Sequence, residues 1–305
     1  LQNTEWKICG LVRWNDKMDN IEHLMEKINK KDKIELVYGD INDLSSLLNV
    51  LSDIKPDYVF HLAAQSYPKT SFDSPLETLE TNILGTAKLL DAIKHLKLNP
   101  VIHICASSEV FGRVPKEFLP IHEDAISKVG TDLVGRFYAE AYDMTVMTTR
   151  MFTHTGPRRG DVFAESTFAK QIAMIEAGLQ EPVIKVGNLD SLRTWSDVRD
   201  AVRAYYLLVT KKPISGEYYN IGGTFSCTVR EMLEYLISLS TVKNIKIEVD
   251  PDRLRPIDAD LQVPDTSKFS LHTGWKPEIK FEKTMFDLLE YWRNEIKSGK
   301  KFLLR

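Results

Sequence analysis

The stretch VIHICASSEVFG, residues 101–112, is the one around which the rest of the chain is organised. It begins with β-branched and apolar residues and then changes abruptly to Ser107, Ser108 and Glu109. A short apolar run bounded by small residues is typical of a buried strand in a parallel sheet. Ligands bind outside the carboxyl ends of strands in open parallel sheets, so these two hydroxyls and the carboxylate are candidates for chemistry. The alternative is a strand end whose serines cap the next element.

The composition is that of an ordinary globular protein. Of the 305 residues, 43% are apolar and 27% are charged, and a chain of this length can bury a large core and form two domains. A formal net charge of −3 gives no indication of a nucleic-acid or membrane partner. No apolar run approaches the ~20 residues that a membrane span needs. We therefore expect a cytoplasmic protein.

The cysteines and histidines give no metal-binding pattern. Cys9, Cys105 and Cys227 are scattered and have neither the spacing of a disulfide framework nor that of a metal site. We expect them to be reduced thiols in a reducing compartment. The seven histidines form no HxH or HExxH pattern, so no metal site is expected.

Strands and helices alternate along the first half of the chain. Strands are predicted at 6–12, 34–38, 58–62, 101–105 and 146–152, and helices at 21–28, 44–51, 78–94 and 125–141. After Gly160 the pattern changes, with helices predicted at 168–177, 197–209, 232–239 and 286–296 and short strands at 182–186, 218–223 and 245–249. This order predicts an α/β fold: a Rossmann-type doubly wound parallel sheet with a smaller C-terminal α/β substrate lobe. We expect the cofactor-binding domain at 1–160 and the substrate lobe at 161–305, with residues 197–222 returning to the Rossmann core.

The first residues are unusual for such a fold. A doubly wound sheet usually begins with a strand and a glycine-rich turn that cradles a pyrophosphate on a helix N-terminus. Here residues 1–5 look like the end of a helix, and the strand predicted at 6–12 follows at once. We expect about one further strand and most of a helix before Leu1 in the natural protein.

Two strand ends carry residues suited to the adenosine half of a dinucleotide. Arg13 directly follows the strand at 6–12, where an acid would bind the ribose hydroxyls and an arginine accommodates a 2′-phosphate. Arg13 therefore favours NADP over NAD; the alternative is an exposed loop arginine. Asp40 follows the strand at 34–38, where it can hydrogen-bond adenine or cap the next helix, and one side chain can do both.

The next strand end and helix offer two more candidates. Ala63 and Ala64 are small, which lets a cofactor approach the backbone closely or allows tight helix–strand packing. Asn82 falls inside the helix predicted at 78–94. Asparagine is unfavourable in a helix interior, so Asn82 is either solvated or bonded across the fold.

Short motifs run in order along almost the whole chain: LVR (11–13), YGDINDL (38–44), HLAAQS (61–66), SSEVFG (107–112), AISK (125–128), GPRRG (156–160), GNLDSLR (187–193), DVRDAVRAYYLL (197–208), NIGG (220–223), RLRP (253–256) and GWKP (274–277). Each is weak alone. Their number and order resemble the extended short-chain dehydrogenase/reductase family, and more closely its nucleotide-sugar 4,6-dehydratases of the GDP-mannose type, which include GDP-manno-heptose dehydratases.

The resemblance implies a reaction and three residues that carry it. Ser107 would lie near sugar O4, Glu109 would be the acid–base residue, and Lys128 would be the lysine of a Tyr/Lys pair that also binds the nicotinamide ribose. NADP⁺ would take hydride from C4, and the resulting 4-keto group would acidify C5–H. A carboxylate would remove that proton and assist loss of water from C6. Hydride would then return to C6, giving a 4-keto-6-deoxy sugar, and a positioned general base contributes ~10²–10⁴-fold to such a rate.

The resemblance also implies the binding residues. The cofactor would contact Arg13, Asp40, Ile41, Leu62, Ala63, Ala64, Asn82, Lys128, His154 and Arg159. The GDP-sugar would contact Ser108, Thr153, Val186, Arg193, Arg255 and Asp258. In the second set the two arginines would bind the diphosphate, which suits the planar guanidinium fork, and Asp258 would accept from the guanosine ribose. The alternative for the arginines is surface salt bridges.

Assembly is also implied by the resemblance. Arg158 and Arg159 would belong to the subunit interface on the cofactor side. A homodimer or homotetramer is therefore expected.

Two departures from the family pattern remain open. Four residues before Lys128 stands Asp124, where the family has the catalytic Tyr, so we expect several residues ending in Tyr between Asp124 and Ala125 in the natural protein. The rival is a non-catalytic, Tyr-less NADP-binding relative. Thr153 stands where GDP-mannose dehydratases have Asn, and a less basic segment follows at 163–167, which leaves mannose and heptose substrates open. A GDP-4-keto-6-deoxymannose reductase is the other enzyme to consider.

Overall fold

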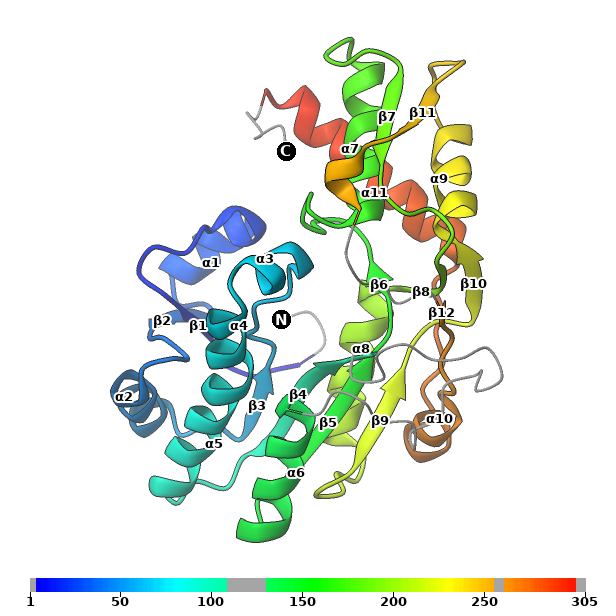
Figure 1. Cartoon of the computed structure of the whole chain (residues 1–305). Coiled ribbons are helices and arrows are strands. Elements are labelled where there is room, and N and C mark those ends of the chain that lie inside the picture. The colour runs from blue at the N-terminus through cyan, green and yellow to red at the C-terminus, as the bar shows by residue number, and fades with distance from the viewer. Residues whose placement is uncertain (1–3, 109–129, 255–260, 300–305) are drawn as a thin grey trace. The chain divides into compact units, whose positions relative to one another are not determined.

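The computed structural model describes residues 4–108, 130–254 and 261–299 of the chain. These residues divide into two compact units (Figure 1). The first unit contains the chain up to Ile104 together with Gly130–Thr148 and Pro213–Glu217, and the second contains the rest. The boundary passes through two strands, β4 and β5. The predicted division at residue 160 separates a cofactor-binding domain from a substrate lobe by their roles, and it stays a prediction.

The first unit alternates strands and helices. Its elements are β1 (Ile8–Val12), η1 (Asp19–Leu24), α1 (Met25–Asn29), β2 (Ile34–Tyr38), α2 (Leu44–Ile54), β3 (Tyr58–His61), α3 (Pro68–Asp73), α4 (Pro75–Leu79), η2 (Glu80–Leu84), α5 (Gly85–His95), α6 (Gly130–Tyr142) and the first parts of β4 (Val101–Ser107) and β5 (Val146–Met151).

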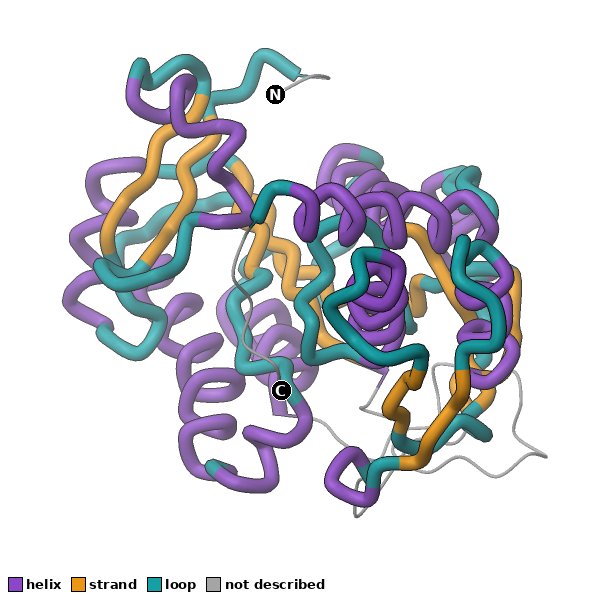
Figure 2. Tube along the Cα trace, turned by 90° about the horizontal axis from the view of Figure 1, so that it is seen from above, coloured by secondary structure: helices purple, strands orange, loops and turns teal. Residues whose placement is uncertain are grey.

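Strand β4 is paired and buried as its apolar sequence predicts. It lies beside β3 in a parallel pair whose register joins Tyr58 to Val101 and His61 to Ile104. Leucines of α2 and α5 cover Ile102 and Ile104, which are fully buried, and Figure 1 shows these two helices side by side. The strand β1 pairs with β2, also in parallel, and Figure 2 shows this pair as two adjacent orange tubes near the N-terminal label. Parallel pairs alternating with helices confirm the predicted α/β class.

Several predicted boundaries need correction. Thr4 and Glu5 are not helical, and the strand predicted from Trp6 begins only at Ile8. The single helix predicted at 78–94 is in fact α4, then one turn of π-helix (η2), then α5. A π-helical turn inserts one extra residue and is frequent at functional sites. Asn82 lies within this turn. A residue that is unfavourable in a regular helix thus occupies an irregular one.

A pair of buried histidines lies on neighbouring strands of the first unit. His61 is 6% exposed and His103 is fully buried. The Thr86 hydroxyl donates to the Asn82 carbonyl at 2.6 Å, so its oxygen accepts from His61 Nε2, 2.9 Å away. Burial lowers the pKa of His61 to about 4. Burial, and then the neighbouring His61, lower the pKa of His103 to about 3. Both rings are therefore neutral near pH 7.

The second unit contains the remaining elements. They are β6 (His154–Thr155), α7 (Ala164–Glu176), β7 (Val183–Val186), β8 (Leu192–Asp197), α8 (Val198–Thr210), β9 (Tyr218–Ile221), β10 (Phe225–Thr228), α9 (Val229–Ser238), β11 (Lys246–Val249), η5 (Pro251–Arg253), β12 (Leu261–Gln262), α10 (Ser267–Thr273) and α11 (Phe281–Lys297), with the ends of β4 and β5. Strand β9 lies beside the end of β5.

Strand β8 is the centre of this unit and was not predicted as a strand. It pairs antiparallel with β10 and parallel with both β12 and β6. The apolar faces of α7, α9 and α11 pack together beside it and form the core of the unit (Figure 1). At Gly223 a Cβ atom would lie 1.8 Å from the Trp195 carbonyl oxygen of β8. Only glycine permits this close approach, which accounts for the second glycine of the NIGG motif.

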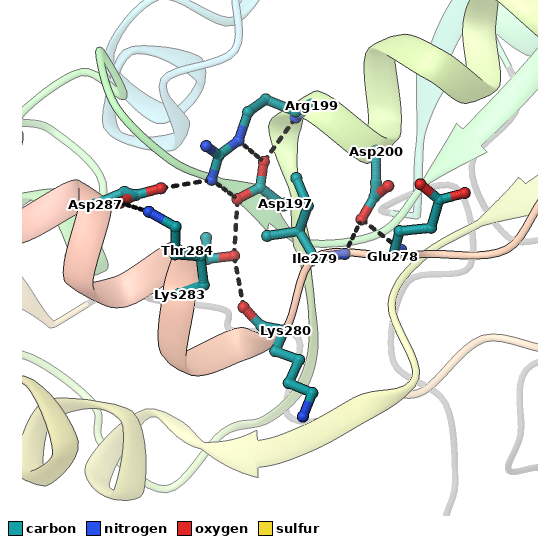
Figure 3. Close-up of polar contacts among 9 residues, drawn as sticks. All are labelled: Asp197, Arg199, Asp200, Glu278, Ile279, Lys280, Lys283, Thr284 and Asp287. Carbon is teal, nitrogen blue, oxygen red and sulfur yellow. Dashed lines mark hydrogen bonds and ion pairs between the residues drawn. The ribbon is translucent and has the colours of Figure 1, made fainter.

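A network of buried carboxylates joins the end of β8 to the start of α11 (Figure 3). Asp197 caps α8 and accepts from Arg199 Nε at 2.8 Å and Nη2 at 2.7 Å, and from Thr284 Oγ1 at 2.8 Å. Burial raises the pKa of Asp197, but the hydrogen bonds from Arg199 and Thr284 outweigh that effect and lower it overall. One oxygen of Asp200 accepts from the backbone N–H groups of Glu278 and Ile279, both at 2.9 Å. These bonds hold the segment before α11 against α8.

The buried histidines predict acid sensitivity. In the unfolded chain these histidines bind protons as the pH falls below about 6.5, whereas in the folded chain they do not until about 4. The stability that the fold has above pH 6.5 is therefore lost as the pH falls through this range. Between pH 7.5 and 5 we expect a loss of about 2 kcal/mol of unfolding free energy per buried histidine. His103→Met should reduce this loss, while His23→Gln, which changes an exposed histidine, should not. Urea unfolding at the two pH values measures it, and an unchanged free energy would contradict the buried neutral pair.

The Asp200 contacts predict a graded effect on stability. Asp200→Ala leaves two backbone N–H groups without their acceptor and should cost about 2–4 kcal/mol of unfolding free energy. Asp200→Asn keeps an oxygen for both groups and should cost less. Glu234→Ala, an exposed change on α9, is the control and should stay within about 0.5 kcal/mol of the parent. Equal losses of unfolding free energy for the Ala and Asn variants in urea unfolding would show that Asp200 does not stabilise the protein by accepting these two backbone hydrogen bonds.

Candidate functional site

The serines at the end of β4 have different environments. Ser107 is exposed, and Ser108 is 5% exposed. Ser108 Oγ lies 3.2 Å from Gln262 Oε1. The same oxygen lies 3.1 Å from Arg193 Nη1. Two of the predicted substrate-binding residues, 85 positions apart in sequence, are thus joined through one amide.

The pairing of two strands creates this bridge. Gln262 lies on β12 directly beside Arg193 on β8, and residues paired in register project from the same face of a sheet. Gln262 is 3% exposed. Sequence reasoning missed this residue. The available signal was a lone polar side chain between the apolar neighbours of the LQV segment.

The segment around Val186, which was expected to contact the GDP-sugar, is closely packed. Val186 is fully buried in the core of the unit, so its side chain cannot border a ligand and only its backbone or its neighbours could. At the next residue, Gly187, a Cβ atom would lie 2.6 Å from the Arg253 carbonyl oxygen. Arg253 Nε in turn donates to Asp250 Oδ2 at 3.3 Å. The turn that leads toward the RLRP motif therefore passes directly over Gly187.

The residues after β5 are tied to their own unit. His154 Nδ1 lies 3.2 Å from the Phe152 carbonyl, to which it can only donate. Burial lowers the pKa of His154, and the charge of Arg159 adds to this effect. Arg159 pairs with Glu165 at 3.2 Å and lies 3.4 Å from the centre of the Phe163 ring. Thr153 is half-buried, and its carbonyl accepts from Ser196 N at 3.0 Å.

In the first unit, Arg13 follows β1 and is exposed. Its Nε and Nη2 atoms lie 3.0 and 2.9 Å from Asp16 Oδ1, and its backbone N–H donates to Asp16 Oδ2. Hydrogen bonds from the Arg13 backbone and side chain lower the pKa of Asp16. Trp14 is 83% exposed, and its ring centre lies 5.1 Å from that of Tyr38 at the end of β2. A cation and two exposed aromatic rings thus stand together at two strand ends.

Asp40 does not cap the helix that follows it. The cap of α2 is Asp43, whose side chain accepts from Ser45 N and Ser46 N. Asp40 Oδ1 instead accepts from Asn42 N at 2.9 Å, which forms a turn directly after β2. Ile41 beside it is half-buried. The capping alternative for Asp40 was therefore wrong, and its carboxylate stands at the strand end.

The residues after β3 leave the backbone accessible. Leu62 is 55% exposed, and Ala63 and Ala64 are exposed as well, which argues against the alternative of tight helix packing. Asn82 accepts from Gln65 N at 2.7 Å and donates to Gln65 O at 3.0 Å. Asn82 is therefore bonded across the fold rather than solvated. It fixes the segment that carries the two alanines.

Some of the predicted residues fall outside the described parts of the chain. These are Glu109, Lys128, Arg255 and Asp258, and the Asp124–Ala125 junction lies outside as well. Among the described residues no group of three or more metal-ligating side chains gathers. Within the same part of the chain, no helix is long and apolar enough to cross a membrane. Cys9, Cys105 and Cys227 are free thiols.

Comparison with known proteins gives consistent results. The family model described as GDP-mannose 4,6 dehydratase matches residues 1–288. GDP-6-deoxy-D-mannose reductase of Pseudomonas aeruginosa is 33% identical, over 79% of this chain and 82% of that protein. GDP-mannose 4,6 dehydratase of Drosophila melanogaster is 29% identical, over 95% of this chain and 80% of that protein.

Solved structures agree on the fold. The structure of RMD from Pseudomonas aeruginosa complexed with NADPH has a TM-score of 0.81 and 27% identity, and covers 95% of this chain and 99% of that one. A dTDP-glucose 4,6-dehydratase from Bacillus anthracis in complex with NAD has a TM-score of 0.79 at 19% identity, and covers 97% and 91%. The fold is thus of the Rossmann type found in extended short-chain dehydrogenases/reductases.

A match over nearly the whole chain, together with a reductase relative at 33% identity, shows that this protein belongs to the GDP-mannose 4,6-dehydratase family and is a nicotinamide-dependent nucleotide-sugar dehydratase or reductase.

Proposed function

We propose that this protein is an NADP-dependent GDP-sugar 4,6-dehydratase that converts GDP-mannose or a GDP-manno-heptose to the GDP-4-keto-6-deoxy sugar. The observation that carries the proposal is the link from the strand-end hydroxyls to a distant arginine: Ser108 and Arg193 meet at Gln262 Oε1, at 3.2 and 3.1 Å. A site that joins a sugar-binding hydroxyl to a phosphate-binding cation suits a nucleotide sugar. The family match over residues 1–288 supports the same substrate class.

The first unit offers features that fit NADP. Ala63 and Ala64 are exposed and have small side chains, which suits close approach of a cofactor, and Asn82 holds the segment that follows through two hydrogen bonds. Exposed Arg13 at the end of β1 suits a 2′-phosphate, and Asp40 at the end of β2 suits the adenine amino group. The remaining proposed contacts with the cofactor are Ile41 and Leu62 of this unit, together with Lys128, His154 and Arg159 from later in the chain. When bound, the nicotinamide accepts a hydride and later returns it.

The residues proposed to act on the sugar have distinct tasks. Ser107, exposed at the end of β4, orients the O4 hydroxyl. Glu109 removes the C5 proton once C4 is a ketone and gives a proton to the departing C6 hydroxyl. Lys128 binds the nicotinamide ribose and lowers the pKa of the tyrosine expected before it. Arg193 and Arg255 bind the diphosphate, Asp258 the guanosine ribose, and Thr153 lies beside the hexose.

We also propose a cytoplasmic homodimer or homotetramer. Exposed apolar side chains on neighbouring elements of the first unit support self-association. Leu76 of α4 is 79% exposed, Leu84 of η2 is 52% exposed, and Phe137 of α6 is 54% exposed. A second copy of the chain would remove these side chains from water.

A GDP-4-keto-6-deoxymannose reductase is the second candidate, favoured by the 33% identity to a reductase. The two activities differ in their cofactor balance. A dehydratase returns its hydride to the sugar, so it releases a 4-keto sugar with no net use of NADPH. A reductase consumes one NADPH for each 4-keto sugar reduced.

The activity test follows from that balance. Incubated with GDP-mannose and catalytic NADP⁺, the chain should release a 4-keto sugar without accumulating NADPH, and the same assay with a GDP-manno-heptose identifies the preferred sugar. Glu109→Gln and Ser107→Ala should each lower turnover by ~10²–10⁴-fold, the contribution of a positioned acid–base or hydroxyl group. NADPH consumption with a 4-keto sugar would instead indicate the reductase. Cofactor binding without turnover, in a chain whose peptide reads HEDAISK, would indicate the Tyr-less relative.

Arg13 predicts the choice of cofactor. Arg13→Ala should weaken NADP binding about tenfold or more, because a charge-assisted contact to the 2′-phosphate is lost, and should leave NAD binding unchanged. Asp16→Asn should strengthen NADP binding, because it removes the carboxylate that pairs with Arg13. Lys17→Ala, a change of an exposed cation in the same loop, controls for general charge. Calorimetric titration with NADP and NAD measures these effects, and equal weakening of both cofactors by Arg13→Ala would contradict a 2′-phosphate role.

A further inference from the structure

We propose that Gln262 is a positioning residue that holds Arg193 in place and fixes the direction of hydrogen bonding at Ser108. The inference rests on the proposed function, in which both partners contact the GDP-sugar. Gln262 itself need not touch the substrate. Its effect would pass through the two side chains that meet at its amide oxygen.

The chemistry of arginine fixes which amide atom faces the bridge. A guanidinium can only donate hydrogen bonds, so the Gln262 atom 3.1 Å from Arg193 Nη1 must be the oxygen. The orientation of the Gln262 amide therefore follows from its partner.

This assignment decides what Ser108 can do. The Gln262 oxygen is an acceptor, so the hydroxyl of Ser108, 3.2 Å away, must donate its single proton to it. Any other group that meets Ser108 Oγ then has to be a donor. A sugar hydroxyl fulfils this condition, whereas a phosphate oxygen or a carbonyl does not. Ser108 is thereby set to bind the hydroxyl-bearing part of a nucleotide sugar.

The same oxygen orients Arg193 without cancelling its charge. A neutral amide accepts one N–H of the guanidinium, which has five donors in all, and does not itself neutralise the positive charge. A carboxylate in the same place would form an ion pair with Arg193. Since Gln262 is 3% exposed, water would screen that pair little. A glutamine thus serves a diphosphate site better than a glutamate of the same shape.

The backbone around the bridge holds it in register. Arg193 lies between Gln262 on β12 and Cys227 on β10. The next residue of β8, Thr194, hydrogen-bonds Ser226 of β10 at 2.7 Å. Strand pairing on both sides of β8 leaves little freedom for the two side chains to separate. Their contact is therefore a consequence of the fold.

The alternative is that Gln262 only satisfies buried polar groups. Gln171 of α7 does that and provides the matched control. It is 8% exposed, and its amide donates to Lys185 O at 3.1 Å and accepts from Lys185 N at 2.9 Å. Substitution of Gln171 should change stability but not ligand affinity.

Calorimetric titration of the full-length, NADP-saturated chain with GDP tests the Arg193 part. Gln262→Glu should weaken GDP binding about tenfold or more, because its carboxylate competes with the diphosphate for Arg193. Gln262→Met, similar in volume but without an acceptor, should weaken it less. The control variants Gln171→Glu and Gln171→Met should bind GDP like the parent. Thermal unfolding of each variant checks that it is folded.

Turnover of the GDP-sugar tests the Ser108 part. Ser108→Ala should raise KM for the GDP-sugar about tenfold while GDP affinity stays near that of the parent, since the Gln262–Arg193 contact remains. In the Gln262→Met background the same change should have a smaller effect, because the hydroxyl is no longer oriented.

The outcomes separate the two claims. If the parent binds GDP and turns over the sugar, yet folded Gln262→Glu binds GDP equally tightly, the positioning role is overturned and the proposed function stands. Additive effects of Ser108→Ala and Gln262→Met would overturn the role at Ser108. A parent chain that binds no GDP overturns the proposed function, and this inference with it.

Discussion

The second unit depends on strand β8, whose backbone hydrogen bonds are shared among three other strands. It pairs antiparallel with β10 and parallel with β12 and β6. Its last residue, Asp197, caps α8 and accepts from Thr284 at the start of α11. Because a strand bonded on both edges cannot shift its register without breaking both ladders, Arg193 is held at a fixed place. The position of Arg193 in the proposed diphosphate site thus originates in the sheet.

Polar side chains with two or more partners recur in this protein where two elements must keep one arrangement. Asp200 joins α8 to the segment before α11, Asn82 joins a π-helical turn to Gln65, and Gln262 joins β12 to Arg193. In each case a side chain satisfies donors that would otherwise lose a partner, and the cost of that loss grows with their burial. These contacts specify one geometry more strongly than apolar packing does, because their donors and acceptors have direction.

The sequence predicted the first unit better than the second, for a physical reason. Strands β2 and β4 are short runs rich in apolar residues, so both could be located from the sequence, and β2 has the predicted bounds Ile34–Tyr38. Strand β8, LRTWSD, is rich in polar residues because its side chains hydrogen-bond neighbouring elements: Arg193 to Gln262, Thr194 to Ser226 and Asp197 to Thr284. It has no apolar run or simple alternation, so no strand could be predicted there.

The residues of the candidate site also differ in how well the sequence alone could indicate them. Ser107 and Arg13 could be proposed as site residues because they lie at the ends of recognisable strands, and Asn82 because it conflicted with its helix. Gln262 could not be found, since its importance arises only when Ser108, Arg193 and β12 come together in the fold. Capping was one of two roles considered for Asp40, whereas Asp43 fulfils it, because both acids precede the same helix and only backbone geometry separates them.

The most direct test of the proposed reaction is to follow the hydride itself. GDP-mannose carrying deuterium at C4 would be incubated with the chain and catalytic NADP⁺, and the product would be examined by NMR and mass spectrometry. The account predicts a 4-keto-6-deoxy product in which the deuterium has moved to C6 without loss to solvent or to free cofactor. Deuterium that ends on free cofactor, or substrate recovered with its label still at C4, would contradict it.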